Sequence, residues 1–169
     1  MPSPTDQSER HAERHCPELE AIRTSRDDWG VVMIRAVKYQ FDDREWEVRF
    51  SNPKAMLPVR NRMGVVVLKP WGRRPTDKGR LPLGSVARHA HLQTERWDSY
   101  FPKRIRVPVN AFCVADVANN ECWYGVMKGQ FLQGICATWD AELRIYLVSL
   151  DTTPEQGEFE SWPRVLSSP

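Results

Sequence analysis

A series of short apolar runs in the second half of the chain constrains the fold more than any other feature. Four such runs follow one another at intervals of about ten residues, and each is rich in β-branched or aromatic residues. Asn119-Asn120, Lys128-Gly129 and Asp140-Ala141 lie between the runs and are typical of tight turns. This pattern predicts a β meander with strands at 112–117, 122–127, 131–138 and 143–150.

The first half of the chain adds further expected strands. They lie at 29–37, 46–50, 63–68 and 104–109. Asp42-Asp43 separates the first two strands and predicts a hairpin turn. Pro108 has no backbone N–H, so the last strand is expected at the edge of a sheet or close to its own end.

Helix is expected only in short pieces. Residues 17–24 and 95–101 fit short helices, and 85–94 fits either a strand or a short helix. Residues 1–15 are polar and show no apolar period, which predicts a disordered tail before a single domain of residues 16–169. The sum predicts an α+β, strand-rich fold, closed as a barrel or built as a two-layer sheet with a few short helices.

The cysteine and hydropathy patterns argue against several classes of protein. The four cysteines are Cys16, Cys113, Cys122 and Cys136, and they show neither a C-x-x-C pair nor a zinc-finger spacing. No apolar run approaches the roughly 18 residues that span a bilayer, and the polar N-terminus has no apolar core of a signal peptide. We therefore expect a cytoplasmic protein with free thiols, no metal, no cofactor and no membrane partner.

Charge is distributed unevenly along the chain. Residues 49–106 hold 14 Lys and Arg against 3 Asp and Glu, a net +11, although the whole chain carries only +2. The flanking segments 1–48 and 107–169 are net acidic, at −4 and −5. If the basic block folds onto one face, it produces a local positive field suited to a polyanion such as nucleic acid. The structural alternative is that these cations solvate loops or pair with the acidic segments.

Several stretches of the chain occur in an order known from one family. They are Arg49 to Pro53 with Leu57 to Val59, Val67 to Trp71, Val86 to Arg88, Arg104 to Phe112, Phe131 to Asp140, Ile145 to Pro154, and Trp162 to Leu166. In this order the chain resembles a degenerate member of the SOS-response-associated peptidase (SRAP) family, whose members bind single-stranded DNA and crosslink to abasic sites. The resemblance covers about residues 49–166 and implies an SRAP-like fold and a place in the DNA damage response.

The chemical positions of that family are not kept. Its nucleophile is a Cys directly after the initiator Met, where this chain has Pro2, and its Asn, Glu and His positions correspond to Val86, Val114 and Phe159. Cys16 replaces the nucleophile only if a cleavage frees its α-amine. The chain also lacks the phosphate-loop, dinucleotide and nucleophile-elbow motifs. The resemblance therefore implies a non-catalytic protein on an enzyme scaffold, with no catalytic residue.

The candidate nucleic-acid ligands come from the basic block. Trp71 is expected to stack on a base, and cationic side chains are expected to contact phosphates. The cations and their neighbours are Lys54, Arg60, Arg73, Arg74, Arg88, His89, Lys103, Arg104 and Arg106. For Arg88 the role follows from its match to the family's Asn-Ala-Arg motif. The alternatives are that Trp71 caps the core and that the cations merely protect a strand edge or solvate loops.

These observations leave two main functions open. The first is a binding module for single-stranded DNA, which requires Arg73, Arg88, Arg104 and Arg106 to converge in the fold. The second is an interaction or inhibitor protein that grips an acidic protein surface, such as that of a nucleic-acid enzyme. Viruses, including phages, and mobile elements carry small diverged chains of this kind. A relocated active site at Cys16 is a third hypothesis.

Overall fold

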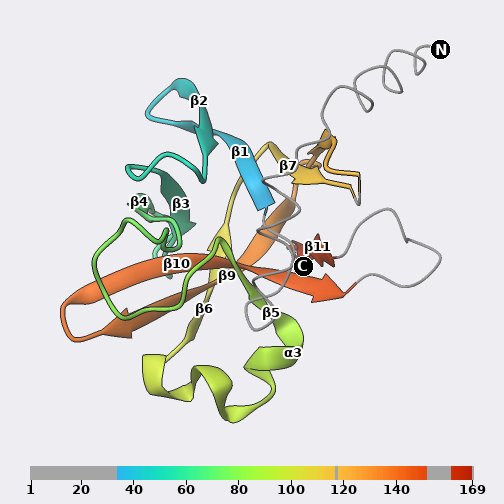
Figure 1. Ribbon diagram of the computed structural model, residues 1–169. Helices are drawn as coiled ribbons and strands as arrows, with labels where there is room; N and C mark the ends of the chain where they lie inside the picture. Colours follow the sequence, from blue (N-terminus) through green and yellow to red (C-terminus); the bar gives the residue numbers. More distant parts are fainter. Residues whose placement is uncertain (1–33, 117, 152–160, 169) are drawn as a thin grey trace.

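The computed structural model describes residues 34–116, 118–151 and 161–168. The expected N-terminal tail, the helix at 17–24, the start of the strand at 29–37, Pro2, Cys16 and Phe159 lie outside the described residues. The described residues form mainly strands, with two short helical segments (Figure 1). The α+β, mostly-sheet class is thereby confirmed, and the described strands form two sheets without closing into a barrel.

The smaller sheet has four strands in the order β2-β1-β7-β8. Its members are β1 (Ile34–Phe41), β2 (Arg44–Arg49), β7 (Ala111–Ala115) and β8 (Glu121–Gly125). Asp42 and Asp43 turn the chain between β1 and β2 with positive φ angles of 58° and 63°, which suit the right-handed twist of a hairpin. The hairpin expected from these two residues is confirmed.

The larger sheet has eight strands, six of them in the order β11-β10-β9-β6-β3-β4, with β12 on β9 and β5 on β10. Its strands are β3 (Met56–Arg60), β4 (Val66–Pro70), β5 (Val86–Arg88), β6 (Lys103–Val107), β9 (Gln130–Trp139), β10 (Glu142–Asp151), β11 (Ser161–Pro163) and β12 (Val165–Ser167). The helical pieces α3 (His89–Leu92) and η1 (Glu95–Tyr100) follow β5, so the segment 85–94 contains both a strand and a helix.

The expected meander is wrong in one respect, although its four strands exist. β7 pairs with β8 in the smaller sheet, whereas β9 pairs with β10, β6 and β12 in the larger one. The chain therefore changes sheets between β8 and β9, and the turn at 127–130 joins two layers. Periodicity along the chain cannot reveal this, because either arrangement buries the same alternating side chains.

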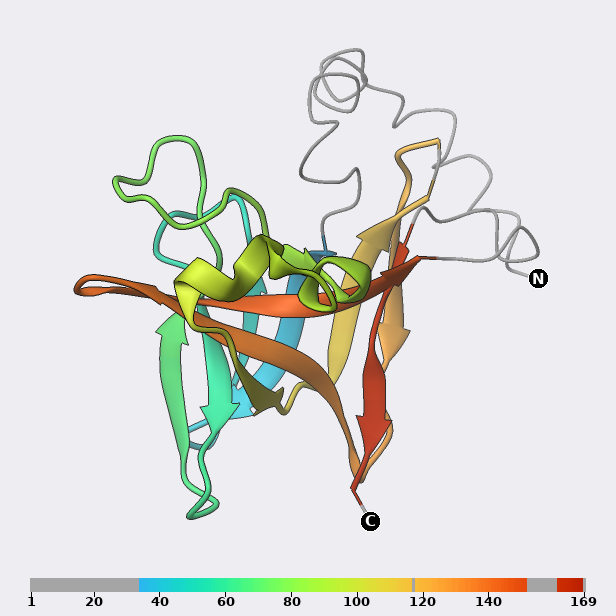
Figure 2. The same cartoon turned by 90° about the horizontal axis from the view of Figure 1, so that it is seen from below.

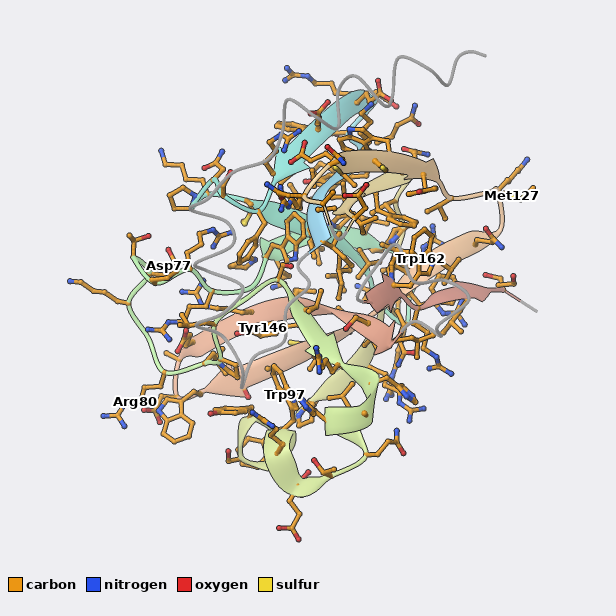
Figure 3. All side chains as sticks on the ribbon, turned by 45° about the vertical axis from the view of Figure 1, so that its right-hand side comes forward. Asp77, Arg80, Trp97, Met127, Tyr146 and Trp162 are labelled. Atoms are coloured by element: carbon orange, nitrogen blue, oxygen red, sulfur yellow. The ribbon has the colours of Figure 1, made fainter. Side chains whose placement is uncertain are left out.

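Two apolar clusters hold the layers together. The larger cluster lies between the sheets and includes Leu57, Leu132 and Leu147. The smaller cluster lies where α3 and η1 cover the other face of β9 and β10, with Trp97 edge-on to Tyr146 at 5.0 Å between ring centroids (Figures 2 and 3). The face of the larger sheet that carries the smaller cluster is the one on which the candidate site lies. Among the described residues, no helix has the length and apolar character needed to cross a membrane.

Candidate nucleic-acid interface

Trp71 is buried in the core and offers no face to a base. Its side chain is 0% exposed, its indole Nε1 donates to the carbonyl oxygen of Ser85 at 3.1 Å, and its ring meets Phe50 edge-on at 5.4 Å. A buried indole needs such a hydrogen-bond partner, and here the partner is a backbone carbonyl. The prediction that Trp71 stacks on nucleic acid is wrong for this fold, and the core role is the one observed.

Arg74 is likewise an internal residue, only 6% exposed. Its guanidinium donates to the carbonyl oxygens of Phe50 at 2.6 Å and Trp71 at 2.9 Å, and to the Asp77 carboxylate at 2.8 Å. Burial alone would raise the pKa of Asp77, but the hydrogen bonds and charge of Arg74, with the charge of Arg144, hold it below its usual value. A phosphate cannot reach donors that are occupied inside the protein, so the prediction for Arg74 is also wrong.

Arg73 also has a structural role, within the loop of residues 71–84, which we call the braced loop. The Nε of Arg73 donates to the carbonyl oxygen of Asp77 at 3.2 Å, and its Nη1 donates to the carbonyl oxygen of Leu81 at 3.0 Å. From β10, Arg144 adds a bond to the Gly72 carbonyl oxygen at 3.0 Å. Figure 3 shows Asp77 and Arg80 on this loop, on the opposite side of the molecule from Met127. Arg73 and Arg74 therefore order the loop itself.

A second group of cations lies in register across the larger sheet. Arg60 of β3 is the direct cross-strand partner of Arg106 of β6, and Arg106 is in turn the partner of Gln133 of β9. Direct partners share a face, and residues two apart on a strand share it too, so Arg104 joins them. Arg60, Arg104 and Arg106 are all exposed. The sequence does not reveal this grouping, because more than 40 residues separate the end of β3 at Arg60 from the start of β6 at Lys103.

Arg164 extends the same row and was not expected as a site residue. It lies between β11 and β12, and its Nη1 donates to the side-chain oxygen of Gln133. Arg106 lies over the Phe131 ring, with its guanidinium carbon 4.8 Å from the ring centroid. We call Arg60, Arg104, Arg106 and Arg164 the arginine strip.

The arginine strip carries positive charge that no carboxylate among residues 34–116, 118–151 and 161–168 neutralises. The ion pairs among the described residues involve Arg35, Arg49, Arg74 and Arg144, and none of them involves a guanidinium of the strip. Like charges placed directly opposite each other on neighbouring strands are destabilising. An anion bound between Arg60 and Arg106 would relieve this repulsion, so the strip is arranged to receive negative charge.

The remaining expected ligands do not join the strip. Lys103 alternates with Arg104 and therefore lies on the other face, opposite Cys136. Arg88 pairs with Ser149 and shares a side with core Val86, and His89 follows it at the start of α3. Lys54 is exposed in the turn before β3, at the opposite end of that strand from Arg60. The expected convergence of Arg73, Arg88, Arg104 and Arg106 is thus found only for the last two.

Phe101, three residues before Arg104 in the sequence, is an exposed aromatic residue that sequence reasoning missed. The residue is 69% exposed, and its φ of 51° and ψ of 55° place a bulky residue in the left-handed region. The following Pro102 normally forces the preceding residue into an extended conformation, so the conformation is strained twice over. Strained residues concentrate at functional sites, and the only sequence signal here was the Phe-Pro pair before a basic strand.

The titratable groups of the smaller sheet serve structure. Arg49 binds Glu121 through two hydrogen bonds of 3.0 and 3.1 Å, and Arg35 adds a third contact. Burial favours a higher pKa for Glu121, but the hydrogen bonds and charges of Arg49 and Arg35 lower it overall. Beneath them, burial raises the pKa of the Cys113 thiol to about 12. A thiol that stays protonated is a poor nucleophile.

Two of the SRAP-derived chemical positions can be placed. Val86 and Val114 are buried members of the large apolar cluster between the sheets. His, Cys, Asp and Glu side chains among the described residues form no group of three or more that could hold a metal. Comparisons of the chain with protein-family models, with curated proteins and with solved structures found no match.

Proposed function

We propose that this chain binds single-stranded nucleic acid, DNA in the first place, through the arginine strip and without catalysing a reaction. The observation that carries the proposal is the direct pairing of Arg60 with Arg106, two exposed cations that form no ion pair with a carboxylate of the described residues. Residues on neighbouring strands lie about 5 Å apart and residues two apart on one strand about 6.6 Å apart. The strip therefore presents several donors to one polyanionic backbone.

A single strand suits the surroundings of the strip better than a duplex. Exposed Phe101 supplies an aromatic face three residues from Arg104, and base stacking on such a face requires an unpaired base. Arginine guanidinium groups contact phosphate oxygens through paired N–H donors, which Arg104 and Arg106 leave unused among the described residues. We also propose that the fold is a diverged SRAP-like scaffold, since the matched stretches of the sequence follow the order of that family. Buried valines stand where the family has its Asn and Glu, which supports the absence of catalysis.

Salt dependence of binding tests this proposal. Fluorescence anisotropy with a labelled oligothymidine at about 50 to 200 mM salt should give a steep loss of affinity, with a slope of about −0.7 for each phosphate neutralised. The variant Arg106→Gln should bind more weakly and reduce the magnitude of the slope by about 0.7. Arg44→Gln is the matched control, because Arg44 is an exposed arginine on the smaller sheet, beside Trp46.

Two outcomes would contradict the proposal. One is the absence of oligonucleotide binding at about 50 mM salt, where electrostatic attraction to a polyanion is strong. The other is an equal loss of affinity in the Arg44→Gln control, which would show that net charge alone governs binding. Retention of a protein from nuclease-treated lysate, without oligonucleotide binding, would favour the interaction-protein alternative.

A further inference from the structure

Two strands lie at open edges of the described sheets. β2 is the last strand at one side of the smaller sheet, and β4 is the last strand at one side of the larger sheet. Figure 1 shows β2 at the top of the view, and Figure 2 shows β4 beside β3 at one side of the molecule. Beyond Pro70 the chain meets β10, where Trp71 bridges Ile145. The open part of the β4 edge is therefore Val66 to Leu68.

The backbone of β4 directs two residues out of the sheet. The Asn61 N–H donates to the Val65 carbonyl oxygen at 2.9 Å, so these two residues form a hydrogen-bonded pair. Bonded and non-bonded pairs alternate along an antiparallel ladder. In the register of β3 with β4, Val66 and Leu68 fall in non-bonded pairs, and their N–H and C=O groups point away from β3. These groups bond to no other described strand.

The backbone of β2 is arranged in the same way. The Phe50 N–H donates to the Arg35 carbonyl oxygen at 2.9 Å, just beyond the ladder of β1 with β2. By the same alternation, Glu45 and Glu47 lie in non-bonded pairs, and their N–H and C=O groups point away from β1. Each edge thus carries two outward residues spaced two apart, which is the spacing that a strand pair needs to exchange hydrogen bonds.

The two edges carry opposite charge. Residues 41–48 hold four Asp and Glu against one Arg, a net −3, and residues 59–70 hold three Lys and Arg and no Asp or Glu, a net +3. Within the described part of the chain, no ion pair involves Asp42, Asp43 or Glu45, and none involves Arg62 or Lys69. The charge on each edge is therefore open to an opposing surface.

Charge selects which edges can meet. Two β4 edges would bring two basic surfaces together and two β2 edges would bring two acidic ones together, and both contacts are destabilising. Charged side chains protect an edge strand against copies of itself, but they do not protect it against an edge of opposite charge. β8 is another edge, but its Glu121 is already bound by Arg49. The edge that complements β4 is thus β2.

We propose that the β4 edge of one copy pairs with the β2 edge of a second copy, so that the protein assembles head to tail. This inference is independent of nucleic-acid binding. Main-chain bonds between the outward residues hold the contact, and half-buried Val67 and exposed Trp46 add apolar area. Because the two surfaces differ, a pair of copies keeps one open edge of each kind and adds further copies into a filament or a closed ring.

Sedimentation velocity of the full chain tests this contact. At about 50 mM salt, the weight-average sedimentation coefficient should rise between about 5 and 200 µM protein, since a contact between single edges is small and weak. At about 500 mM salt the rise should be much smaller, because the screening length falls to about 4 Å.

Two charge-reversed variants sharpen the test. Glu45→Lys/Glu47→Lys makes the β2 edge basic, and Arg62→Glu/Lys69→Glu makes the β4 edge acidic. Each variant alone should associate about tenfold more weakly than the unmodified protein. An equimolar mixture has complementary edges again and should associate as the unmodified protein does. None of these residues belongs to an apolar cluster, so the melting temperatures should be unchanged.

Glu47→Pro tests the main-chain bonds. Proline has no N–H, and the Glu47 N–H points away from β1, so the ladder of β1 with β2 is kept while the open edge loses a donor. Glu47→Gln is the matched control, because it removes the same charge and keeps the N–H. Glu47→Gln should weaken association about twofold, whereas Glu47→Pro should weaken it about tenfold. A melting curve of Glu47→Pro checks that the fold is kept.

The contact is overturned by several results. Protein that is monomeric at every concentration in low salt overturns it and leaves the proposed function standing. Association that is insensitive to salt, that persists in either charge-reversed variant or that fails to return in their mixture also overturns it. Equal association of Glu47→Pro and Glu47→Gln rejects the strand pairing. Monomeric protein that binds labelled oligoglutamate, with binding lost in Arg62→Glu/Lys69→Glu, would assign the β4 edge to an acidic partner protein instead.

Discussion

Arg74 in the braced loop and Arg106 in the arginine strip make the same local contact in opposite surroundings. Each guanidinium lies over a phenylalanine ring, at 4.4 Å above Phe50 and 4.8 Å above Phe131. Arg74 is buried and donates to two carbonyl oxygens and a carboxylate, whereas Arg106 is exposed and bonds to none of the described residues.

The difference separates an arginine that orders the fold from an arginine whose donors are open to an external anion. A guanidinium has five N–H donors, and every donor occupied inside the protein is lost to an external anion. The N–H donors of Arg74 bond to acceptors inside the protein and order residues 71–84 against β10. The N–H donors of Arg106 bond to none of the described residues, and the charge of the paired Arg60 strengthens the positive field around them. Charge density along the chain is therefore a weaker guide to a binding site than the number of free donors in the fold.

The strongest way to break this comparison is to remove each guanidinium in turn. Arg74→Met should lower the free energy of unfolding by about 3 kcal/mol, because it leaves two buried carbonyl oxygens without their donor and removes the nearer of the two guanidinium groups beside Asp77. Arg106→Met should leave the urea midpoint almost unchanged and weaken binding of oligothymidine. Urea unfolding followed by tryptophan fluorescence, with anisotropy on the same samples, measures both. Equal destabilisation by the two substitutions would remove the distinction between the regions.

Lowering the pH should also distinguish the braced loop from the arginine strip, with a smaller effect on stability. The pKa of Asp77 is lower in the folded chain than in the unfolded one, so the stabilising contribution of Asp77 is present above about pH 4 and is lost as pH falls below that value. Asp77→Asn should therefore unfold with a smaller change in urea midpoint between about pH 6 and pH 3 than the unmodified chain. Arginines do not titrate in this range, so the strip contributes nothing to the difference. An unchanged pH profile in Asp77→Asn would show that the braced loop does not depend on this carboxylate.

Local signals predicted much of the strand content. The predicted turn at Asp42-Asp43 joins β1 to β2. The four apolar runs after residue 110 form β7, β8, β9 and β10. These elements follow from turn chemistry and alternation within a few residues. The start of β4 was predicted at 63 and lies at Val66, because Met63 and Gly64 belong to the turn that Asn61 orders.

The candidate site was predicted less well, because it depends on contacts between distant segments. The strip unites Arg60, Arg104 and Arg106 with Arg164, and only the strand order β9-β6-β3 places them side by side. Burial was equally hidden. Trp71 lies next to cations in the sequence, as a residue that binds nucleic acid would. Its indole N–H is nevertheless buried, because the carbonyl oxygen of Ser85 accepts its hydrogen bond and removes the cost of an unpaired polar group. Strand order and long-range hydrogen bonds are not encoded in any single window of the chain.

The smallest expected effect concerns Phe101, the exposed counterpart of buried Trp71. Phe101→Gly removes a bulky side chain from a left-handed conformation, so the free energy of unfolding should rise by up to about 1 kcal/mol. If the ring stacks on a base, the same variant should bind oligothymidine roughly fivefold more weakly, whereas Phe101→Tyr keeps an aromatic face and should bind as the unmodified chain does. Greater stability together with weaker binding would mean that the strain at Phe101 is maintained for the ligand. Greater stability with unchanged affinity would confine the site to the arginines. Neither Phe101 beside β6 in the sequence nor Trp71 in the braced loop would then stack on a base.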